Sequence, residues 1–275
     1  MRRMQAITGI VATTLLLGGG SAFGTPRTTD ATPSPTTTAS TTTSPTPTPT
    51  TTTSPTPSPT TTTTTTVKHT LANAQRLLNG LGCDAGLVDG RAGTHTTAAI
   101  IRFQAANRLA QVGWMNSTTW NKLTATKKIA CNRRPVPAYS GTGRRIVVDR
   151  TQNWIWLVRS DGTIKWQGGM IDNPTVWRSG TYRSGSDCGR PAHSRYGLDY
   201  SKTLRLDYFT RLVTGQCGVG FHRVPVYRTS GNQIHPDWYL GTNLKVSHGC
   251  MRVTMRTAQE ITAFTAGSTR IVVKP

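Results

Sequence analysis

The sequence predicts a multidomain protein in which a small three-helix domain precedes a mainly β domain of the sandwich or barrel type. Hydrophobic residues recur at helical spacing between residues 67 and 133, whereas short β-type runs separated by turns fill residues 143–275. Many short strands joined by turns are typical of a sandwich or barrel. Residues 134–142 are left as a linker between the two domains.

In the helical segment, apolar residues from Leu71 to Leu81 predict a first helix, which Gly82 ends. We expect Thr94 to cap a second helix. A third, short helix is expected to begin at a cap formed by Asn116 or Ser117.

In the β segment, strand-type runs are expected at residues 144–149, 154–158, 164–166, 180–183, 204–209, 219–222 and 269–273. Asp161 and Gly162 are expected to form a hairpin turn. Thr257 and Glu260 predict a capping box that opens a short helix ending near Phe264.

The first 24 residues are typical of an export signal peptide. Arg2 and Arg3 form a positive start, an apolar run follows at 7–17, and small residues precede position 25. The alternative is an uncleaved membrane anchor, but the run is short for a bilayer span and rich in Thr and Gly. We therefore expect a secreted, extracytoplasmic protein of the cell wall, which contacts the membrane only through this segment if the segment stays uncleaved.

Residues 25–66 consist almost entirely of Thr, Pro, Ser and Ala. Such a segment buries too little apolar area to offset its chain entropy, so we expect a disordered spacer with extended, polyproline-like character. Tracts of this composition also carry O-linked sugars in exported proteins, and the simpler alternative is an inert tether.

The formal net charge is +21 at pH 7, which admits nucleic acid, anionic lipid or acidic wall polymers as partners. The basic residues are scattered rather than arranged in a stripe, and the aromatic-basic alternation of an RNA-binding sheet is absent. Together with the export signal, this pattern favours an anionic wall polymer over nucleic acid. The alternative is that the charge only keeps the protein soluble.

Five cysteines in an exported chain indicate disulfides and at least one unpaired thiol. Cys83 and Cys131 bracket the helical segment, and Cys188 and Cys217 bracket a Gly- and Arg-rich stretch of the β segment, so we expect these two pairs. Closing loops of these lengths stabilises by about 3.5–4 kcal/mol each in the chain-entropy description. Cys250 is left over, and a thiol kept free in an oxidising compartment usually serves as a nucleophile.

Cys250 lies in the run Ser-His-Gly-Cys-Met-Arg at 247–252. A cysteine attacks carbonyl groups as its thiolate and needs a nearby proton acceptor, which is usually an imidazole. His248 is adjacent in sequence, but adjacency does not place its ring on the sulfur. His222 and His235 are therefore the candidate bases.

Glycine before the cysteine lets the backbone approach a tetrahedral intermediate. The amides of Gly249 and Cys250 are accordingly expected to donate hydrogen bonds to its oxyanion.

Helix-core and turn positions of the first domain form a recurring pattern, made up of 74–79, 81–82, 88–90, 93–94, 97–100, 103–104, 107 and 119–123. With these residues, the segment 67–133 resembles the peptidoglycan-binding-like domain family. The resemblance implies binding to cell-wall glycopeptide and names no binding residues. The alternative is a packing module that positions the following domain.

A second pattern runs from about residue 145 to 273 and consists of 146–148, 157–162, 179–182, 220–222 and the run at 247–252. With these residues, the segment resembles the L,D-transpeptidase catalytic domain. The resemblance implies that the enzyme cuts a peptidoglycan tetrapeptide stem after its third residue and releases D-Ala through a thioester. The acyl group then passes to an amine acceptor, which forms a cross-link or anchors a protein.

Stem peptides and wall glycan are therefore the expected partners, and neither a cofactor nor a metal is expected. Three alternatives stay open: an L,D-carboxypeptidase that uses the same site, a catalytically silent wall-binding protein, and a metal site.

The resemblance also assigns roles by position. Cys250 is the nucleophile, and His222 is the base, held by the carbonyl group of Arg223. The expected catalytic residues are Cys250, His222, His248 and Gly249, and the expected substrate-binding residues are Ser247, Arg252, Phe221 and Arg223.

Spacing leaves the choice of base open. His222 lies farther before the motif than is usual in the family, because 24 residues lie between His222 and Ser247. Only 11 residues lie between His235 and Ser247. We favour His222 because the sequence around it fits a strand, while His235 lies in a polar run. His235 is expected to be a solvated loop histidine, as are His69, His95 and His193.

Overall fold

The computed structural model describes residues 68–176 and 178–275, which belong to one compact unit. The expected signal segment 1–24 and spacer 25–66 lie outside the described residues. Within the described ranges, no helix combines the length and the apolar character that a bilayer span requires.

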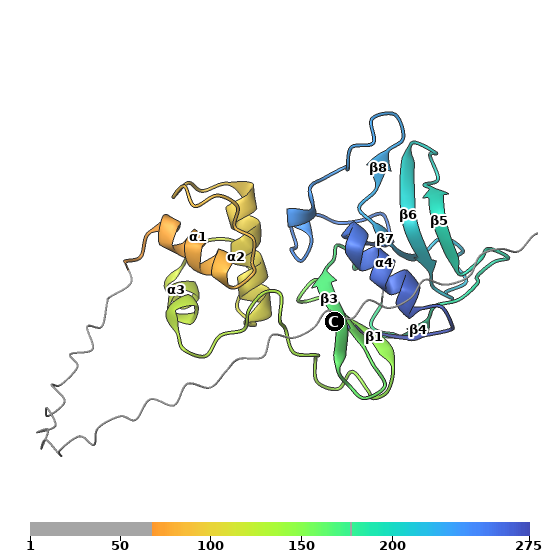
Figure 1. Ribbon diagram of the computed structural model, residues 1–275, viewed down its shortest axis with the longest axis horizontal. Coiled ribbons are helices and arrows are strands. Elements are labelled where there is room, and N and C mark those ends of the chain that lie inside the picture. The colour runs from red at the N-terminus through yellow and green to blue at the C-terminus, as the bar shows by residue number, and fades with distance from the viewer. Residues whose placement is uncertain (1–67, 177) are drawn as a thin grey trace, which may run out of the picture. The chain divides into compact units, whose positions relative to one another are not determined.

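Three helices form the first described region, as the sequence predicts (Figure 1): α1 (Leu71–Gly80), α2 (Thr94–Ala106) and α3 (Ser117–Thr124). Asn116 caps α3, because its side chain accepts a hydrogen bond of 2.8 Å from the amide of Thr119. The expectation that Thr94 caps α2 is wrong. Gly93 occupies the N-cap position without a side-chain bond, and Thr94 is the first helical residue.

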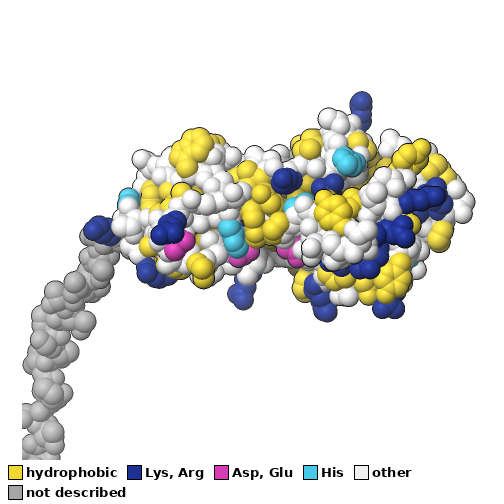
Figure 2. Space-filling view, turned by 90° about the horizontal axis from the view of Figure 1, so that it is seen from above, with side chains coloured by type: hydrophobic (Ala, Val, Ile, Leu, Met, Phe, Trp, Pro, Cys, Tyr) yellow, Lys and Arg dark blue, Asp and Glu magenta, His cyan; other side chains and the backbone are white. Residues whose placement is uncertain are grey.

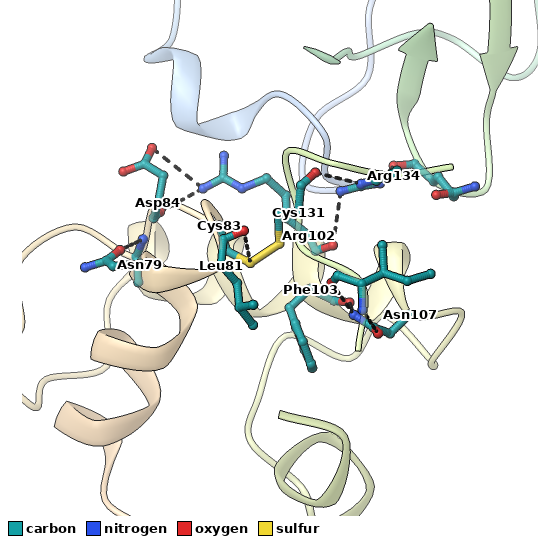
Figure 3. Close-up of a disulfide and its surroundings, with 12 residues drawn as sticks. Asn79, Leu81, Cys83, Asp84, Arg102, Phe103, Asn107, Cys131 and Arg134 are labelled. Carbon is teal, nitrogen blue, oxygen red and sulfur yellow. Dashed lines mark hydrogen bonds and ion pairs between the residues drawn. A yellow bond between two sulfur atoms is a disulfide. The ribbon is translucent and has the colours of Figure 1, made fainter. Parts of the chain in front are cut away.

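The helices share a small hydrophobic core. Leu78 of α1, Phe103 of α2 and Leu123 of α3 are fully buried in it. The disulfide between Cys83 and Cys131 belongs to the same core and confirms the predicted pair (Figure 3). A core of this size is marginal, so a covalent link across it compensates for the limited apolar area.

The second region is a mainly β domain with two sheets, which confirms the predicted fold class (Figure 1). The first sheet has the order β3 (Ile164–Gly169), β2 (Trp154–Val158), β1 (Arg145–Asp149), β10 (Arg270–Lys274), β4 (Gly180–Arg183). The second has the order β5 (His193–Leu198), β6 (Leu204–Arg211), β7 (Gly220–Arg223), β9 (Met251–Val253), with β8 (Val226–Tyr227) paired to β6.

Both sheets and helix α4 (Met255–Phe264) contribute to one core, to which Ile146, Phe221 and Ile261 belong with no exposed surface. The arrangement is therefore a sandwich rather than a barrel. Two strand pairs are parallel, β1 with β10 and β7 with β9. A parallel pair requires a crossover connection, and the chain between β1 and β10 includes the strands of the second sheet and α4.

Helix α4 does not begin as the sequence predicts. Thr254 is the N-cap, since its side chain accepts a 3.1 Å hydrogen bond from the amide of Thr257. The predicted capping box at Thr257 is wrong, because Glu260 pairs with Lys165 and Arg256 instead of reaching back to the helix start.

Two buried arginines join the helical region to the β domain. Arg134 donates to the carbonyl oxygens of Cys131 (3.0 Å), Arg102 (3.1 Å) and Gln152 (2.9 Å), and it is 1% exposed (Figure 3). Burial lowers its pKa to about 9. Arg134 is the first residue of the predicted linker, so that linker begins inside the packed structure.

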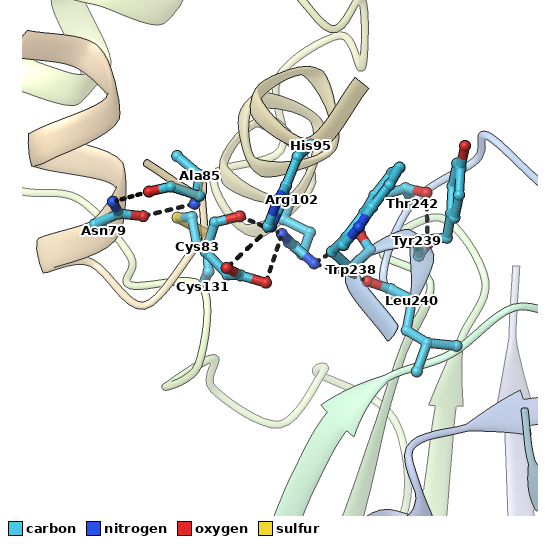
Figure 4. Close-up of polar contacts among 12 residues, drawn as sticks. Asn79, Cys83, Ala85, His95, Arg102, Cys131, Trp238, Tyr239, Leu240 and Thr242 are labelled. Carbon is cyan, nitrogen blue, oxygen red and sulfur yellow. Dashed lines mark hydrogen bonds and ion pairs between the residues drawn. A yellow bond between two sulfur atoms is a disulfide. The ribbon is translucent and has the colours of Figure 1, made fainter. Parts of the chain in front are cut away.

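Arg102 lies in α2 and is also buried. Its guanidinium donates to the carbonyl oxygens of Trp238 (2.9 Å, Figure 4) and Asp84 (2.8 Å, Figure 3). A buried charge is costly unless hydrogen bonds satisfy it, and here the two terminal nitrogens find acceptors in both regions. Beside it, the ring of His95 stacks on Trp238 with centroids 5.1 Å apart.

Figure 2 shows how charged side chains are distributed on one face of the molecule. On the face that Figure 2 shows, Lys and Arg side chains lie among hydrophobic and polar ones, and few acidic side chains are visible. This distribution agrees with the scattered basic residues of the sequence.

Candidate active site

Two parallel strands of the second sheet position the predicted nucleophile and base. In the register of β7 and β9, Phe221 pairs with Met251, and His222 pairs with Arg252. Successive side chains of a strand point to opposite faces. Because Phe221 and Met251 are fully buried in the core, His222 and Arg252 lie on the other face. Cys250 is two residues before Arg252 and shares that face.

A cleft of about 910 Å³ lies on this face. It brings together six residues predicted from the sequence, namely Ser247, His248, Gly249, Cys250, Arg252 and His222. Its other walls come from segments that the sequence analysis did not connect with the site, and they include Arg190, Phe209, Arg211, Cys217 and Gly218. Strand pairing between β6 and β7 brings those segments to the motif, and no local sequence signal reports it.

Cys250 is unpaired, as predicted, and partly buried. Its thiol donates a hydrogen bond to the carbonyl oxygen of Gly218 at 3.3 Å. Burial raises the pKa of the thiol, and a backbone hydrogen bond at Gly220 and the charges of Arg252 and Arg211 lower it in part. The net direction is upward, so the resting group at neutral pH is the thiol.

His222 is 3% exposed and held by its neighbour. Its Nδ1 lies 2.6 Å from the carbonyl oxygen of Arg223. A carbonyl oxygen only accepts, so Nδ1 carries the proton and Nε2 keeps its lone pair. Burial lowers the pKa of His222 to about 4, against the opposing effect of the Arg223 carbonyl. The ring is therefore neutral at pH 7 and able to take a proton at Nε2.

Phe209 supports this ring from β6. The two rings are stacked, with centroids 5.8 Å apart and planes inclined by 9°. This contact restricts the orientation of the His222 ring. The carbonyl of Arg223 and the face of Phe209 together define the ring position.

His235 is buried, contrary to expectation, and lies outside the cleft. It is 6% exposed, so the prediction of a solvated loop histidine is wrong. Its Nδ1 lies 3.0 Å from the carbonyl oxygen of Pro236, and its ring meets Tyr239 edge-on. Burial lowers its pKa as well. His235 is not among the residues that line the cleft.

The other three histidines also have specific surroundings. His69 is exposed and stacks on Trp120. For His95 and His193 the expected loop position is wrong, since His95 lies in α2 and His193 in β5. His193 Nε2 is 2.9 Å from the hydroxyl of Thr265. None of the three lines the cleft.

Ser247 and Gly249 shape the turn before the cysteine. Ser247 is 2% exposed, and its amide donates to the carbonyl of Asp172 at 3.0 Å. Its hydroxyl accepts a 3.0 Å hydrogen bond from the amide of Gly249. The expectation that this amide donates to an oxyanion does not fit this conformation, because the bond is directed to Ser247. Gly249 has φ +144°, which favours glycine.

The predicted substrate-binding residues divide into two groups. Arg252 is 8% exposed, lines the cleft, and has no carboxylate within ion-pair distance in the part of the chain that the structure describes. Arg223 instead pairs with Asp207 at 3.1 Å. The expectation that Phe221 contacts substrate is wrong, because strand alternation turns it into the core. His248 is exposed at the rim of the cleft.

The second predicted disulfide, between Cys188 and Cys217, is also confirmed. It lies at the cleft wall, where Cys217 precedes the Gly218 carbonyl that contacts the Cys250 thiol. Across residues 68–176 and 178–275, no group of three or more His, Cys, Asp or Glu side chains is placed to hold a metal ion.

Residues 70–123 match the family described as putative peptidoglycan binding domain. This match covers α1, α2 and all but the last residue of α3, and it agrees with the resemblance seen in the sequence. A search among curated proteins finds no match.

Solved structures give weaker similarities. An L,D-transpeptidase from Xylanimonas cellulosilytica is 18% identical, with a TM-score of 0.44, over 74% of this chain and 92% of the other. An L,D-transpeptidase from Stackebrandtia nassauensis is 17% identical, with a TM-score of 0.39, over 74% and 90%. A fused zinc-dependent amidase/peptidase/peptidoglycan-binding protein from Clostridium acetobutylicum is 19% identical, with a TM-score of 0.33, over 74% and 94%. These similarities assign no activity to the chain.

The cleft itself combines groups that suit acyl transfer. A thiol, a neutral imidazole with a free Nε2 and the guanidinium groups of Arg252 and Arg211 line one space. The imidazole can take the thiol proton during attack, and the cationic groups favour the negative charge that develops on sulfur and on a carbonyl oxygen.

Proposed function

We propose that this chain is a cysteine-dependent L,D-transpeptidase of peptidoglycan. The observation that carries the proposal is the pair formed by unpaired Cys250 and buried, neutral His222 on one face of the β7–β9 pair, at the wall of one cleft. The neighbouring peptidoglycan-binding domain supports the substrate class.

In the first half-reaction, Nε2 of His222 takes the Cys250 proton while the sulfur attacks the carbonyl carbon of the third stem residue. The carbonyl π electrons move to its oxygen and form a tetrahedral oxyanion, which the positive charges of the cleft stabilise. The intermediate collapses to a thioester. His222 returns the proton to the departing amine, and D-Ala leaves.

In the second half-reaction, an amine of another stem or of a protein attacks the thioester. His222 accepts the proton of the attacking nitrogen, the new amide bond forms as the C–S bond breaks, and His222 passes the proton to the departing sulfur, which regenerates the thiol. Water in place of the amine would give a carboxypeptidase with the same residues. Both outcomes use one thioester, so the acceptor alone distinguishes them.

Product analysis tests the proposal. Purified protein is incubated with tetrapeptide stems, and the products are separated by mass. We expect dimers that have lost one D-Ala, and no product with Cys250→Ala. Tripeptides alone would indicate the carboxypeptidase. Absence of both products, or retained turnover in Cys250→Ala, would contradict the proposal.

A reactive thiol of this kind should also open a strained lactam. We expect a carbapenem to add covalently to the wild-type chain and raise its intact mass by the mass of the drug. An unchanged mass after prolonged incubation would count against the proposed nucleophile.

In this proposal, the helical domain and the basic surface keep the enzyme at the cell wall. The helical domain holds wall glycopeptide, and the basic surface contacts anionic wall polymers after secretion. We expect the protein to co-sediment with isolated wall, and the part of binding due to charge to weaken as salt rises.

A further inference from the structure

Arg211 lies outside the cysteine motif but lines the same cleft. It is the last residue of β6, and its partner in the strand register is Gly220 of β7. Phe221 pairs with Met251 in the parallel register of β7 and β9, so Gly220 and Cys250, the residues that precede them, lie at the same level. Arg211 is 7% exposed and lines the cleft.

Three contacts hold the Arg211 guanidinium. Nε donates to the carbonyl oxygen of Pro191 at 3.1 Å, and one terminal nitrogen donates to that of Cys217 at 2.6 Å. The guanidinium carbon lies 5.0 Å from the ring centroid of Phe209, the residue that stacks on His222. A planar guanidinium fixed at several nitrogens has little freedom to turn away.

The segment Cys217–Gly218 contacts both the Arg211 guanidinium and the Cys250 thiol. Cys217, whose carbonyl binds Arg211, is followed by Gly218, whose carbonyl accepts the Cys250 thiol. The same segment is held from its other side, since Asp187 accepts hydrogen bonds from the amides of Gly215 and Cys217. The adjoining Cys188–Cys217 disulfide closes this arrangement.

We propose that Arg211 is a positioning residue for Cys250, which holds the Cys217–Gly218 segment against the thiol and keeps a positive charge beside the sulfur as the thiolate forms. This inference rests on the proposed function, in which Cys250 is the nucleophile. In agreement with it, the charge of Arg211 lowers the pKa of the Cys250 thiol in part, against the larger effect of burial.

Alkylation of Cys250 tests this role without any stem substrate. With both disulfides intact, Cys250 is the one thiol that iodoacetamide can reach, and intact mass reports its rate as a function of pH. For Arg211→Gln, we expect the midpoint of the pH profile to rise by about one pH unit. Arg211→Lys keeps the charge but not the planar fork of donors, so it should restore about half of that rise and leave the midpoint above the wild-type value.

Arg195→Gln is the matched control, because Arg195 is exposed on β5 and does not line the cleft. We expect its midpoint to equal that of the wild type. In the stem assay, Arg211→Gln should lower kcat about tenfold or more with KM within about threefold, since Arg211 acts on the nucleophile rather than on substrate binding.

A wild-type midpoint in Arg211→Gln, an equal rise in Arg195→Gln, or no restoration by Arg211→Lys would overturn the inference. If Arg211→Gln does not fold, Arg211→Lys is compared with the wild type instead. A midpoint of Arg211→Lys above that of Arg195→Gln supports the role. An unchanged midpoint of Arg211→Lys together with an unchanged kcat refutes it. A wild-type protein without stem products but with the expected alkylation profiles would refute the transpeptidase and leave the role of Arg211 supported.

Discussion

At the scale of single residues, the site rests on two groups that are both uncharged before reaction. Burial raises the pKa of Cys250 and lowers that of His222 to about 4, so a thiol faces the same cleft as a neutral imidazole. In the proposed reaction, the proton therefore moves during attack and not in advance, so the sulfur becomes nucleophilic only when a substrate carbonyl is in place.

The choice between the two candidate bases gives the first prediction. His222→Gln removes the acceptor at Nε2, and we expect kcat to fall about 10²- to 10⁴-fold in the stem assay. His235→Gln is the matched control, because His235 is equally buried but does not line the cleft, and it should keep kcat within about threefold. The reverse order of the two effects would make His235 the base.

The depressed pKa of His222 also predicts a pH dependence of stability. Between about 4 and 6.5, an unfolded His222 binds a proton that the folded ring does not, so the free energy of unfolding decreases as pH falls through this window. The contribution is fully present above pH 6.5 and amounts to about 3 kcal/mol.

Urea unfolding at several pH values measures this effect, and His222→Gln isolates it from the other histidines. We expect the wild type to lose more stability than His222→Gln between pH 6.5 and 4. Equal losses in the two proteins would show that His222 is not buried in its neutral form.

The sequence singled out Cys250 and His222, which the structure places at one cleft, because their neighbours form a compact motif and a strand-type run. The expectation that Phe221 meets substrate failed, because neighbouring residues of a strand point to opposite faces and Phe221 takes the face that is buried in the core. The sequence also missed Arg211 and Phe209, since only the β6–β7 pairing brings them to the site.

At the scale of elements, the approach of β6, β7 and β9 requires a glycine at position 220. A Cβ there would lie 2.3 Å from the carbonyl oxygen of Thr210 and 2.7 Å from the ring of Phe209. No side-chain atom fits at such distances without moving the backbone. The position beside Cys250 is therefore closed to every other residue.

We predict that Gly220→Ala lowers the free energy of unfolding by about 1–3 kcal/mol and impairs turnover, because the strand that carries His222 must shift. Gly267→Ala is the control, since a Cβ at Gly267 meets no atom within 4 Å. Urea unfolding and the stem assay measure both variants. A Gly220→Ala protein as stable and active as Gly267→Ala would contradict the close packing described for this position.

The two disulfides should differ in their effect on activity. Both close long loops, so removing either costs about 3.5–4 kcal/mol of stability in the chain-entropy description. Only the Cys188–Cys217 bond lies at the cleft wall. We expect a Cys188→Ser, Cys217→Ser double variant to lose most of its kcat, and a Cys83→Ser, Cys131→Ser variant to keep it at a temperature where both are folded. Equal kcat values would contradict a role of the wall segment in catalysis.

Most elements were predictable from local patterns, and the exceptions have a physical cause. Helices α1 to α3 and the longer strands carry clear apolar periodicity. Strand β9 has only three residues, and β5 has a partly exposed, mixed composition, so neither gives a strand signal by itself. The parallel pairing of β7 with β9, on which the site depends, is a long-range property.

At the scale of the whole described unit, polar contacts of buried arginines join the helical region to the β domain. Arg102 and Arg134 bond to backbone carbonyl groups of both regions (Figures 3 and 4). The sequence gives no hint of this, because arginine is usually a surface residue. The helical region is thus attached to the β domain by specific bonds as well as by the chain.

This interface gives the fifth prediction. Arg134→Met leaves three carbonyl groups without their donor, and we expect a loss of about 3 kcal/mol in the free energy of unfolding. The helical region and the β domain should then unfold in separate steps. Arg133→Met is the matched control, because Arg133 is adjacent and exposed. Urea unfolding followed by circular dichroism and tryptophan fluorescence measures both, and a single transition with unchanged midpoint in Arg134→Met would contradict the account.

The most direct test of the central claim is to trap the acyl group on the protein. The wild-type chain is mixed with a tetrapeptide stem, quenched in acid, digested and mapped by mass spectrometry. We predict that the peptide containing Cys250 gains the mass of the stem without its terminal D-Ala, and that His222→Gln gains it far more slowly. An adduct on another residue, or none in a wild-type sample that consumes the stem, would contradict the assignment of Cys250 as the nucleophile.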